Sequence, residues 1–365
     1  MRYVDEFRDP AAACALLARI VAESRRPVRF MEFCGGHTHA ILRYGLRRLL
    51  PPTVRLLAGP GCPVCVTAAG DLDRAIALAR VPGAILATFG DMVRVPGTRG
   101  TLETARAAGA DVRTVTSPLD ALAAARRHPE RPVILLGVGF EATAPGVAAT
   151  LERADAEGVP NLFLYSLHKR TLPAVRAVLG GGGVRVDGVI GPGHVAAVVG
   201  ADAWRPVAEE YGVPCAVAGF EPLDILDAIA RLVEMAEAGR AEVANAYPRS
   251  VRPEGNPAAR AALDRVFCAD DAAWRGLGVL PESGLALRPE FAHRDAAAAF
   301  AEALVEVAPG EEPAGCRCGD VLRGALEPPG CPLYRTACTP ERPVGPCMVS
   351  SEGACAAHYR YGEAA

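Results

Sequence analysis

Short apolar runs alternate with amphipathic stretches from about residue 28 to residue 238. Eight of these runs have the length of β-strands and are almost continuously apolar, which is typical of strands buried on both faces of a sheet. Strand–helix alternation of this kind predicts parallel β-sheets that are covered by helices on both faces. The predicted strands are VRFMEF (28–33), VRLLA (54–58), AILATF (84–89), VRTVT (112–116), VILLGV (133–138), LFLYSL (162–167), DGVIG (187–191) and CAVAGF (215–220).

Repeated motifs predict two α/β domains of similar design. LLAGPGCPVC and VIGPGHVAAV both place Gly-Pro-Gly directly after a predicted strand, and GVGFEATAP and VAGFEPLDIL both place Gly-Phe-Glu there. We therefore expect one α/β domain over residues 28–130 and a second over residues 131–222. Residues 1–27 and 223–365 are expected to form a third, mostly helical or irregular domain, because the sequence after residue 240 is rich in turn residues.

The overall composition favours a globular protein and excludes two classes of partner. Half of the 365 residues are hydrophobic, which is enough for a large core. The net charge of −3 gives no general field for polyanions, so we expect no nucleic-acid partner. MRYVDEFRDP lacks the hydrophobic core of a signal peptide, and no apolar run reaches the ~18–20 residues of a membrane span. The expected location is therefore the cytoplasm, with no membrane association.

Twelve cysteines in a reducing compartment require an explanation other than structural disulfides. Cys14, Cys215 and Cys268 stand alone in apolar or helical contexts, and we expect them to be small buried hydrophobic residues. The other nine fall into three clusters. Two clusters follow predicted strands, and the third lies in the C-terminal tail.

The tail carries six cysteines in a segment too rich in Pro and Gly to build a large core alone, so a metal centre is expected to order it. Since His358 is the only histidine nearby, thiolate ligation of a 4Fe–4S cluster is favoured over zinc. Such a cluster takes four cysteines, and the remaining two could cycle between dithiol and disulfide. The six residues are Cys316, Cys318, Cys331, Cys338, Cys347 and Cys355.

The two other clusters are CGGHTH and CPVC. Cys34 precedes two glycines at the start of a predicted helix, where the positive end of the helix should lower its pKa and favour the thiolate. His37 and His39 add nitrogen ligands or proton carriers. Cys62 and Cys65 have the spacing of a redox dithiol or of half a zinc site. Redox use is favoured, because no second cysteine pair lies nearby in the sequence.

Polar residues beside glycine follow the other predicted strands. They could be helix caps or turn formers. However, ligands of open parallel sheets bind at the carboxyl ends of the strands, so we expect these residues to converge with the cysteine motifs in a substrate or partner cleft. Lys169 is also the only lysine among 39 Lys and Arg residues. The residues of this predicted cleft, together with His39, are Asp91, Glu141, Lys169, His194 and Glu221.

Taken together, these motifs resemble those of the hydrogenase maturation protein HypD family over essentially the full length of the chain. One departure is Ala142, where the family's Gly-Phe-Glu motif would place a hydroxyl residue. The motifs that carry the resemblance are CGGHTHA, GPGCPVC, GFE-x-T-AP, LHK, GPGHV, GFEPLDIL and CTPERPVGPCMVSSEGACAAHYRYG.

The resemblance implies a scaffold on which the iron of a NiFe hydrogenase receives two cyanides and one carbon monoxide. It implies a complex with a HypC-type small chaperone and transfer of cyanide from a C-terminal thiocyanate on a HypE-type donor. The iron would then reach the hydrogenase large-subunit precursor through the chaperone. The resemblance also implies that Cys34 holds this iron together with a cysteine of the chaperone, and that Cys62 and Cys65 either ligate iron or relay electrons.

In the tail, the family spacing implies that four cysteines hold a 4Fe–4S cluster and that Cys318 and Cys347 form a redox pair. The four implied ligands are Cys316, Cys331, Cys338 and Cys355.

Two other functions are compatible with the residues. One is a stand-alone iron–sulfur thiol–disulfide reductase, which would turn over small disulfides without a partner protein. The other is a zinc hydrolase built from Cys34, His37 and His39.

Overall fold

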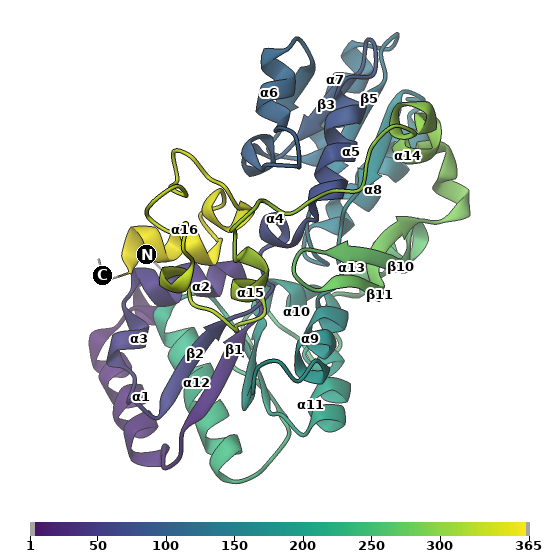
Figure 1. Ribbon diagram of the computed structural model, residues 1–365. Coiled ribbons are helices and arrows are strands. Elements are labelled where there is room, and N and C mark those ends of the chain that lie inside the picture. Colours follow the sequence, from purple (N-terminus) through teal and green to yellow (C-terminus); the bar gives the residue numbers. More distant parts are fainter. Residues whose placement is uncertain (1–3, 363–365) are drawn as a thin grey trace.

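The computed structural model describes residues 4–362. Two parallel sheets covered by helices make up most of the molecule, which confirms the predicted α/β class (Figure 1). All eight predicted strands are present, and their bounds agree with the prediction within two residues. The strands are β1 Val28–Glu32, β2 Val54–Ala58, β3 Ile85–Thr88, β4 Asp111–Thr114, β5 Val133–Gly137, β6 Leu162–Ser166, β7 Gly188–Pro192, β8 Cys215–Ala218, β9 Val243–Asn245, β10 Phe267–Trp274 and β11 Gly278–Leu287.

Many of the helices begin with a proline or a polar cap, as helix N-termini require. None of the helices in residues 4–362 is both long enough and apolar enough to cross a bilayer. The helices are α1 Pro10–Glu23, α2 Gly35–Arg43, α3 Leu46–Leu49, α4 Pro63–Val66, α5 Ala69–Ala79, α6 Leu102–Ala107, α7 Pro118–Arg127, α8 Ala144–Ala156, α9 Thr171–Gly180, α10 Gly193–Val199, α11 Arg205–Tyr211, α12 Pro222–Glu237, α13 Pro257–Val266, α14 Ala296–Ala299, α15 Cys318–Leu322 and α16 Ala354–Tyr361.

The first sheet has the strand order β2-β1-β7-β8-β9. Successive residues of β1 point to opposite faces, so Phe30 packs with α1, α2 and α12 while Met31 packs with α9, α10 and α11. Each face has its own buried core. The strand order reverses between β1 and β7, because β2 lies on one side of β1 and the later strands lie on the other.

The second parallel sheet has the order β4-β3-β5-β6, and we call it the inserted sheet because its chain lies between β2 and β7. One face packs against α5, α6 and α14, and the other packs against α7, α8 and α13. Its strands are almost completely buried, as the continuous apolar runs predict. The strand order reverses between β3 and β5.

The sheets divide the chain differently from the predicted domains 28–130 and 131–222. β1 and β2 pair with β7, β8 and β9 instead of sharing a sheet with β3 and β4. The predicted boundary near residue 130 therefore falls inside the inserted sheet, between β4 and β5. The apolar pattern of a buried parallel strand is the same in both sheets, so alternation alone does not say which strands pair.

The predicted third domain is also distributed over the molecule. α1, α12 and β9 complete the first sheet, and α13 and α14 cover the inserted sheet. β10 and β11 form an antiparallel hairpin in a stretch that was expected to be helical or irregular. The C-terminal segment from about residue 310 lies between the two sheets, beside α2 and α4 (Figure 1, yellow). Of the isolated cysteines, Cys215 is buried as predicted, Cys268 is partly buried, and Cys14 is exposed, contrary to the prediction.

Candidate functional site

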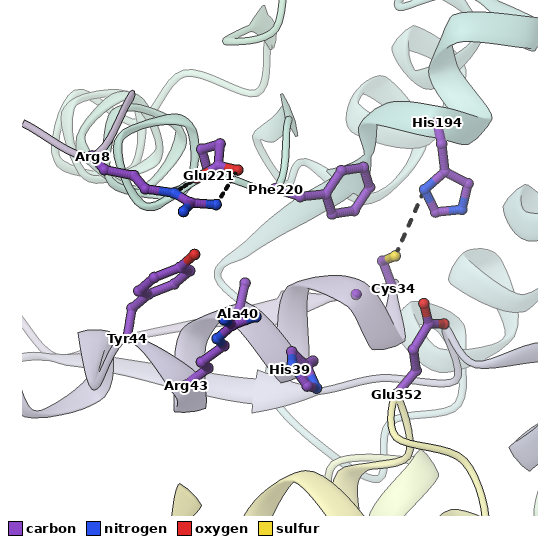
Figure 2. A pocket seen from close by; sticks show the side chains of 11 residues that line it. Arg8, Cys34, His39, Ala40, Arg43, Tyr44, His194, Phe220, Glu221 and Glu352 are labelled. Carbon is purple, nitrogen blue, oxygen red and sulfur yellow. Dashed lines mark hydrogen bonds and ion pairs between the residues drawn. The ribbon is translucent and has the colours of Figure 1, made fainter. Parts of the chain in front are cut away.

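The loops at the strand-order reversal of the first sheet bring together two of the predicted site residues. Cys34 follows β1 and His194 follows β7, and Cys34 Sγ lies 3.9 Å from His194 Nδ1. Figure 2 shows the two side chains facing each other at the wall of an open cavity of about 450 Å³. This position is where parallel sheets commonly bind their ligands.

The same cavity is completed by distant parts of the chain (Figure 2). Glu352 reaches it from the C-terminal segment, close to Cys34. At the other end, Glu221 accepts hydrogen bonds from Arg8 in an ion pair. Phe220 lies between these ends, with its ring 5.2 Å from the His194 ring. The cavity therefore has a thiol and a carboxylic acid at one end and an ion pair at the other.

Cys34 is buried, and burial raises the pKa of its thiol. The charge of Glu352 raises this pKa further, whereas the backbone N–H of His37 at the start of α2 lowers it. The predicted lowering of the Cys34 pKa by the helix terminus is therefore wrong, because desolvation outweighs it. Coordination to a cation would release the proton, since thiolates are the ligating form.

Glu32, in β1, holds the backbone of the loop that carries Cys34 through hydrogen bonds of its side chain. Its buried carboxyl group accepts a hydrogen bond from the Cys34 backbone N–H at 2.9 Å and another from the Thr38 hydroxyl. Burial raises the pKa of Glu32 to about 8. Glu32 was not predicted as a site residue from the sequence. The sequence feature that could have identified it is an acidic residue within a predicted strand that is mostly apolar.

The two histidines of CGGHTH turn to different partners. His37 is buried, donates from Nε2 to Gly219 O at 2.9 Å, and stacks on Phe220. Burial lowers the pKa of His37 to about 4, so its ring is neutral. His39 lines the cavity and its Nδ1 donates to Ser351 O at 3.0 Å. No three His, Cys, Asp or Glu side chains of residues 4–362 converge on a single-ion site. Cys34, His37 and His39, the residues of the zinc hydrolase alternative, instead face separate partners.

Glycine lets the loops of the two N-terminal cysteine motifs touch. Gly35 N–H donates to Gly61 O at 3.2 Å. A Cβ atom at Gly61 would lie 2.1 Å from Cys34 N, and a Cβ atom at Gly35 would lie 2.6 Å from Glu352 Cβ and 3.1 Å from Cys62 Cβ. Three segments that are far apart in sequence therefore meet at backbone distance.

Cys62 and Cys65 are buried on either side of the first turn of α4, and the Cys65 N–H donates to Cys62 Sγ at 3.3 Å. Burial and the neighbouring Cys65 raise the pKa of Cys62. Burial alone would raise the pKa of Cys65 as well, but hydrogen bonds with Cys347 and Cys62 and the charge of Arg275 lower it. Cys65 is therefore the thiolate of this pair.

Arg275 was not identified from the sequence. Its buried guanidinium group donates to Thr67 O at 3.0 Å and pairs with Glu312, and its backbone N–H donates to Val66 O at 2.9 Å. These bonds hold it against the end of α4, directly after Cys65. The residue lies at the turn between β10 and β11, a hairpin that the sequence pattern did not predict.

Cys347 is the junction between the N-terminal and C-terminal cysteines. Its Sγ lies 2.7 Å from Cys318 Sγ, and it also makes hydrogen bonds with Cys65 and Cys355 that influence its pKa. A series of neighbouring thiols therefore runs from Cys62 through Cys65 and Cys347 to Cys318. The cysteines of the chain are free thiols.

All six cysteines of the tail line one small cavity with apolar walls. Cys338 Sγ accepts a hydrogen bond from Val344 N–H at 3.3 Å, and a Cβ atom at Gly345 would lie 2.6 Å from Cys316 Sγ. A 4Fe–4S cluster takes four cysteine thiolates, and its potential is tuned by hydrogen bonds to sulfur and by exclusion of solvent. The donor set, the apolar enclosure and the N–H donor to sulfur fit such a cluster.

Three of the predicted cleft residues, Asp91, Glu141 and Lys169, do not line the Cys34 cavity. Asp91 is exposed after β3. Burial raises the pKa of Glu352, and the charges of Cys65 and Asp91 raise it further, while the charge of Asp91 also opposes the lowering of the Cys65 pKa. Glu141 is buried and accepts hydrogen bonds from Thr171 N–H and Thr171 Oγ1, both at 2.8 Å. It therefore holds the start of α9. Lys169 is also buried at the edge of the inserted sheet and does not line the Cys34 cavity.

The fold and the site define a class of α/β protein in which thiols from both ends of the chain meet between two parallel sheets. Residues 11–362 match the HypD family, described as the hydrogenase formation hypA family. The chain therefore belongs to this family of hydrogenase maturation factors, as its motifs indicated.

Relatives of known name match over almost their whole length. The chain is 50% identical over 371 residues to the hydrogenase maturation factor HypD of Azotobacter vinelandii, which covers 99% of this chain and 97% of that relative. It is 48% identical to the hydrogenase expression/formation protein HupD of Azotobacter chroococcum mcd 1, with the same coverage. It is 44% identical to HypD of Escherichia coli (strain K12), covering 99% of this chain and 98% of that relative.

Proposed function

We propose that this maturation factor is the cytoplasmic scaffold on which the iron of a NiFe hydrogenase receives two cyanides and one carbon monoxide. It would do so in complex with a HypC-type chaperone, with cyanide from a HypE-type donor, before the chaperone carries the iron to the hydrogenase large-subunit precursor. The observation that carries the proposal is the position of Cys34, which faces an open cavity and is backed by a series of buried thiols.

The iron, as the cargo of the reaction, would be held by Cys34 and by a thiolate of the chaperone. Iron that carries cyanide and carbon monoxide is stabilised by soft thiolate donors. The cavity leaves room for a second protein to supply its ligand, because it is open on one side. Burial lowers the pKa of His194 to about 4, so its imidazole stays neutral and can accept a hydrogen bond beside the proposed iron position.

Release of cyanide from a thiocyanate requires two electrons. The S–C bond breaks, cyanide leaves as an anion to the iron, and the donor sulfur leaves as a thiolate. Oxidation of the Cys62 thiol and the Cys65 thiolate to a disulfide supplies both electrons and one proton. The proton neutralises the donor thiolate, and cyanide passes to the iron as an anion.

The disulfide of Cys62 and Cys65 would be reduced again by thiol–disulfide exchange with the tail. Cys347 attacks the Cys65 sulfur, and Cys318 then resolves the mixed disulfide, so that oxidation passes to the Cys318–Cys347 pair. The contact of Cys347 with both Cys65 and Cys318 supports this order. A 4Fe–4S cluster, bound by the four remaining tail cysteines, would supply electrons to the pair one at a time. These ligands are Cys316, Cys331, Cys338 and Cys355.

Infrared and Mössbauer spectroscopy of the protein co-purified with its small chaperone would test this function. We expect Cys62→Ser and Cys65→Ser to keep iron but lose the cyanide bands, and Cys34→Ser to lose the cargo iron itself. Cys14→Ser, at an exposed cysteine outside the site, is the matched control. Unchanged cyanide loading in Cys62→Ser would reject the relay. Partner-free turnover of small disulfides that is unaffected by Cys34→Ser would favour the reductase alternative.

A further inference from the structure

A second polar cavity, of about 200 Å³, lies at the edge of the inserted sheet and takes no part in the proposed thiol chemistry. It is enclosed by α5, by the residues that follow β6, and by the β10–β11 hairpin. The hairpin closes it through backbone bonds, since Leu285 N–H donates to His168 O at 3.1 Å and Arg170 N–H donates to Ser283 O at 2.7 Å. We call it the Lys169 cavity.

His168 brings a buried acceptor without a partner to this cavity. The Ser166 hydroxyl donates to Leu285 O at 2.7 Å, so its oxygen accepts a hydrogen bond from His168 Nδ1–H at 3.2 Å. Nε2 therefore carries a lone pair, and within residues 4–362 it has no hydrogen-bond partner. Burial and the charge of Lys169 lower the pKa of His168 to about 4, so the ring stays neutral.

Lys169 brings a buried cation that has one hydrogen-bond acceptor and lies over the Trp274 ring, 5.5 Å from the ring centroid. It is 2% exposed, and its Nζ donates to Ala273 O at 2.8 Å. An ammonium group has three donors, and the described residues provide no acceptor for the other two. It is also the single lysine of a chain that otherwise uses arginine.

Two ionisable groups of α5 face Lys169 from the opposite wall. Asp71 is largely buried, burial raises the pKa of its carboxyl group, and no hydrogen bond joins it to a described residue. Arg74 stands at the rim, with a hydrogen bond to Tyr165 that counters the rise in the tyrosine pKa caused by burial. The cavity thus presents donors at Lys169 and Arg74 and acceptors at His168 and Asp71. Asp270 and Asp271 also line it from the hairpin, where Oδ1 of each accepts a backbone N–H.

Buried polar groups in proteins are nearly always paired, by protein, water or ligand. A single unpaired histidine nitrogen is usually explained by one water. Here, the unpaired Nε2 of His168 stands with the charged groups of Lys169, Arg74 and Asp71 at one cavity. The cavity lies beside the carboxyl end of a parallel strand, where α/β sheets place ligands. Its volume corresponds to roughly six to seven waters at ~30 Å³ each. A ligand of that size has about six non-hydrogen atoms.

We propose that the Lys169 cavity binds a small α-hydroxy or α-amino carboxylate. The carboxylate accepts hydrogen bonds from Lys169 Nζ and from Arg74. The neighbouring hydroxyl or ammonium group donates to His168 Nε2 and to Asp71. This site is separate from the Cys34 cavity and does not depend on the proposed function.

Calorimetric titration of the intact protein, isolated without oxygen, tests the proposal with glycolate, lactate, glycine and serine. At least one of these four compounds should bind at a single saturable site. Comparison of the two hydroxy acids with the two amino acids identifies whether a hydroxyl or an ammonium group is recognised. Propionate, which lacks the α-donor, should bind about tenfold more weakly or worse, because it leaves His168 Nε2 unpaired. Failure of all four acids to bind at millimolar concentration overturns the proposal.

Two variants locate the site. Lys169→Met should weaken binding by about tenfold or more, because it removes the buried cation. Should that variant fail to fold, Arg74→Gln at the rim should still fold and weaken binding by roughly threefold or more, as loss of one exposed charged partner would. Arg170→Met is the matched control, since its side chain donates to Glu282 O instead of lining the cavity. Equal binding by Arg74→Gln and the wild type overturns the proposal.

Discussion

The carboxyl edges of the two parallel sheets have the same architecture but different chemistry. In each, a histidine follows a strand within two residues and turns toward a cavity. His194 after β7 faces the thiol of Cys34, whereas His168 after β6 lies beside the amine of Lys169. Both imidazoles are kept neutral by burial, with their pKa lowered to about 4. The fold therefore fixes the position of the side chains, and the loop residues decide the chemistry.

The two edges also differ in how they are completed. The thiol edge needs the C-terminal segment, which brings Glu352 and Cys347, and it lies in a core shared by both sheets. Phe140 from the inserted sheet and Val195 from the first sheet pack in the same cluster as the buried cysteines. The polar edge is closed by α5 and by the β10–β11 hairpin, without the C-terminal segment. Thiol chemistry here depends on close backbone approach between distant segments, and the polar cavity depends on side-chain pairing.

The largest effect should come from cutting the thiol series at its junction. Cys347→Ser removes the sulfur that contacts Cys65 and lies 2.7 Å from Cys318. We expect hydrogenase maturation, measured as hydrogenase activity in a complementation strain, to fall by about tenfold or more, because a serine oxygen cannot enter thiol–disulfide exchange. Cys14→Ser should leave the activity unchanged. Equal activities for the two variants would remove the tail from the thiol series.

A second prediction concerns the close backbone approach at the thiol edge. Gly61→Ala places a Cβ atom 2.1 Å from Cys34 N, so the two loops must separate. We expect a loss of unfolding free energy of about 3 kcal/mol, near the upper end for overpacking, together with loss of cargo iron. The measurement is denaturant unfolding with parallel iron analysis.

The matched control is Gly146→Ala in α8, where no described atom lies within 4 Å of the new Cβ atom. It should stabilise the protein by about 0.4–1 kcal/mol, because alanine restricts the unfolded chain. Equal stabilities for the two variants would mean that the loops tolerate a larger separation than the structure implies.

Every strand of the two parallel sheets except the short edge strand β9 could be predicted from the sequence, whereas the pairing of the strands could not. VILLGV and CAVAGF are continuous apolar runs flanked by turns, which identifies a buried strand without saying which sheet it joins. The β10–β11 hairpin escaped prediction because several of its residues are exposed and because Pro281 and Glu282, with a φ of 49°, interrupt the alternation. The error about the domain boundaries follows from the same ambiguity.

The site was predictable where chemistry follows a strand directly. Cys34 and His194 could be placed at a sheet edge for that reason. Glu352 and Arg275 could not, because they reach the site through long-range packing of segments without a regular pattern. Lys169 follows a strand as well, but belongs to the other edge, and the sequence could not assign it to a sheet.

The pH dependence of stability should report on the polar edge. The pKa of His168 is about 4 in the folded protein and about 6.5 in an unfolded chain. Its neutral ring therefore contributes stability that is present above pH 6.5 and is lost as the pH falls toward 4. From pH 7.5 to pH 5 we expect a loss on the order of 2 kcal/mol from this residue.

His168→Asn tests this prediction, because the asparagine amide can keep the donor to Ser166 and does not titrate. Between pH 7.5 and pH 5 the variant should lose less unfolding free energy than the wild type, by about 2 kcal/mol. The other buried histidines remain in both proteins, so the difference isolates His168. An identical pH profile would show that this ring takes up a proton without cost, and that the polar edge is open to water.

The smallest effect should come from loosening the helices that cover each sheet, and it tests how the predicted third domain is divided. Asn256 caps α13 by accepting from Ala258 N–H at 3.0 Å and Ala259 N–H at 3.1 Å. Asp9 caps α1 by accepting from Ala12 N–H at 2.7 Å. Removing either cap with alanine should cost about 1 kcal/mol.

The location of the effect should differ between the two variants. Asn256→Ala should raise hydrogen exchange in α13 and in α8, against which α13 packs on the inserted sheet. Asp9→Ala should raise exchange in α1 and in α12 on the first sheet. Because local unfolding follows cooperative units, each substitution should leave the other pair of helices protected. If both variants loosened all four helices equally, the two sheets would unfold as one unit, and the thiol edge and the polar edge would share their stability.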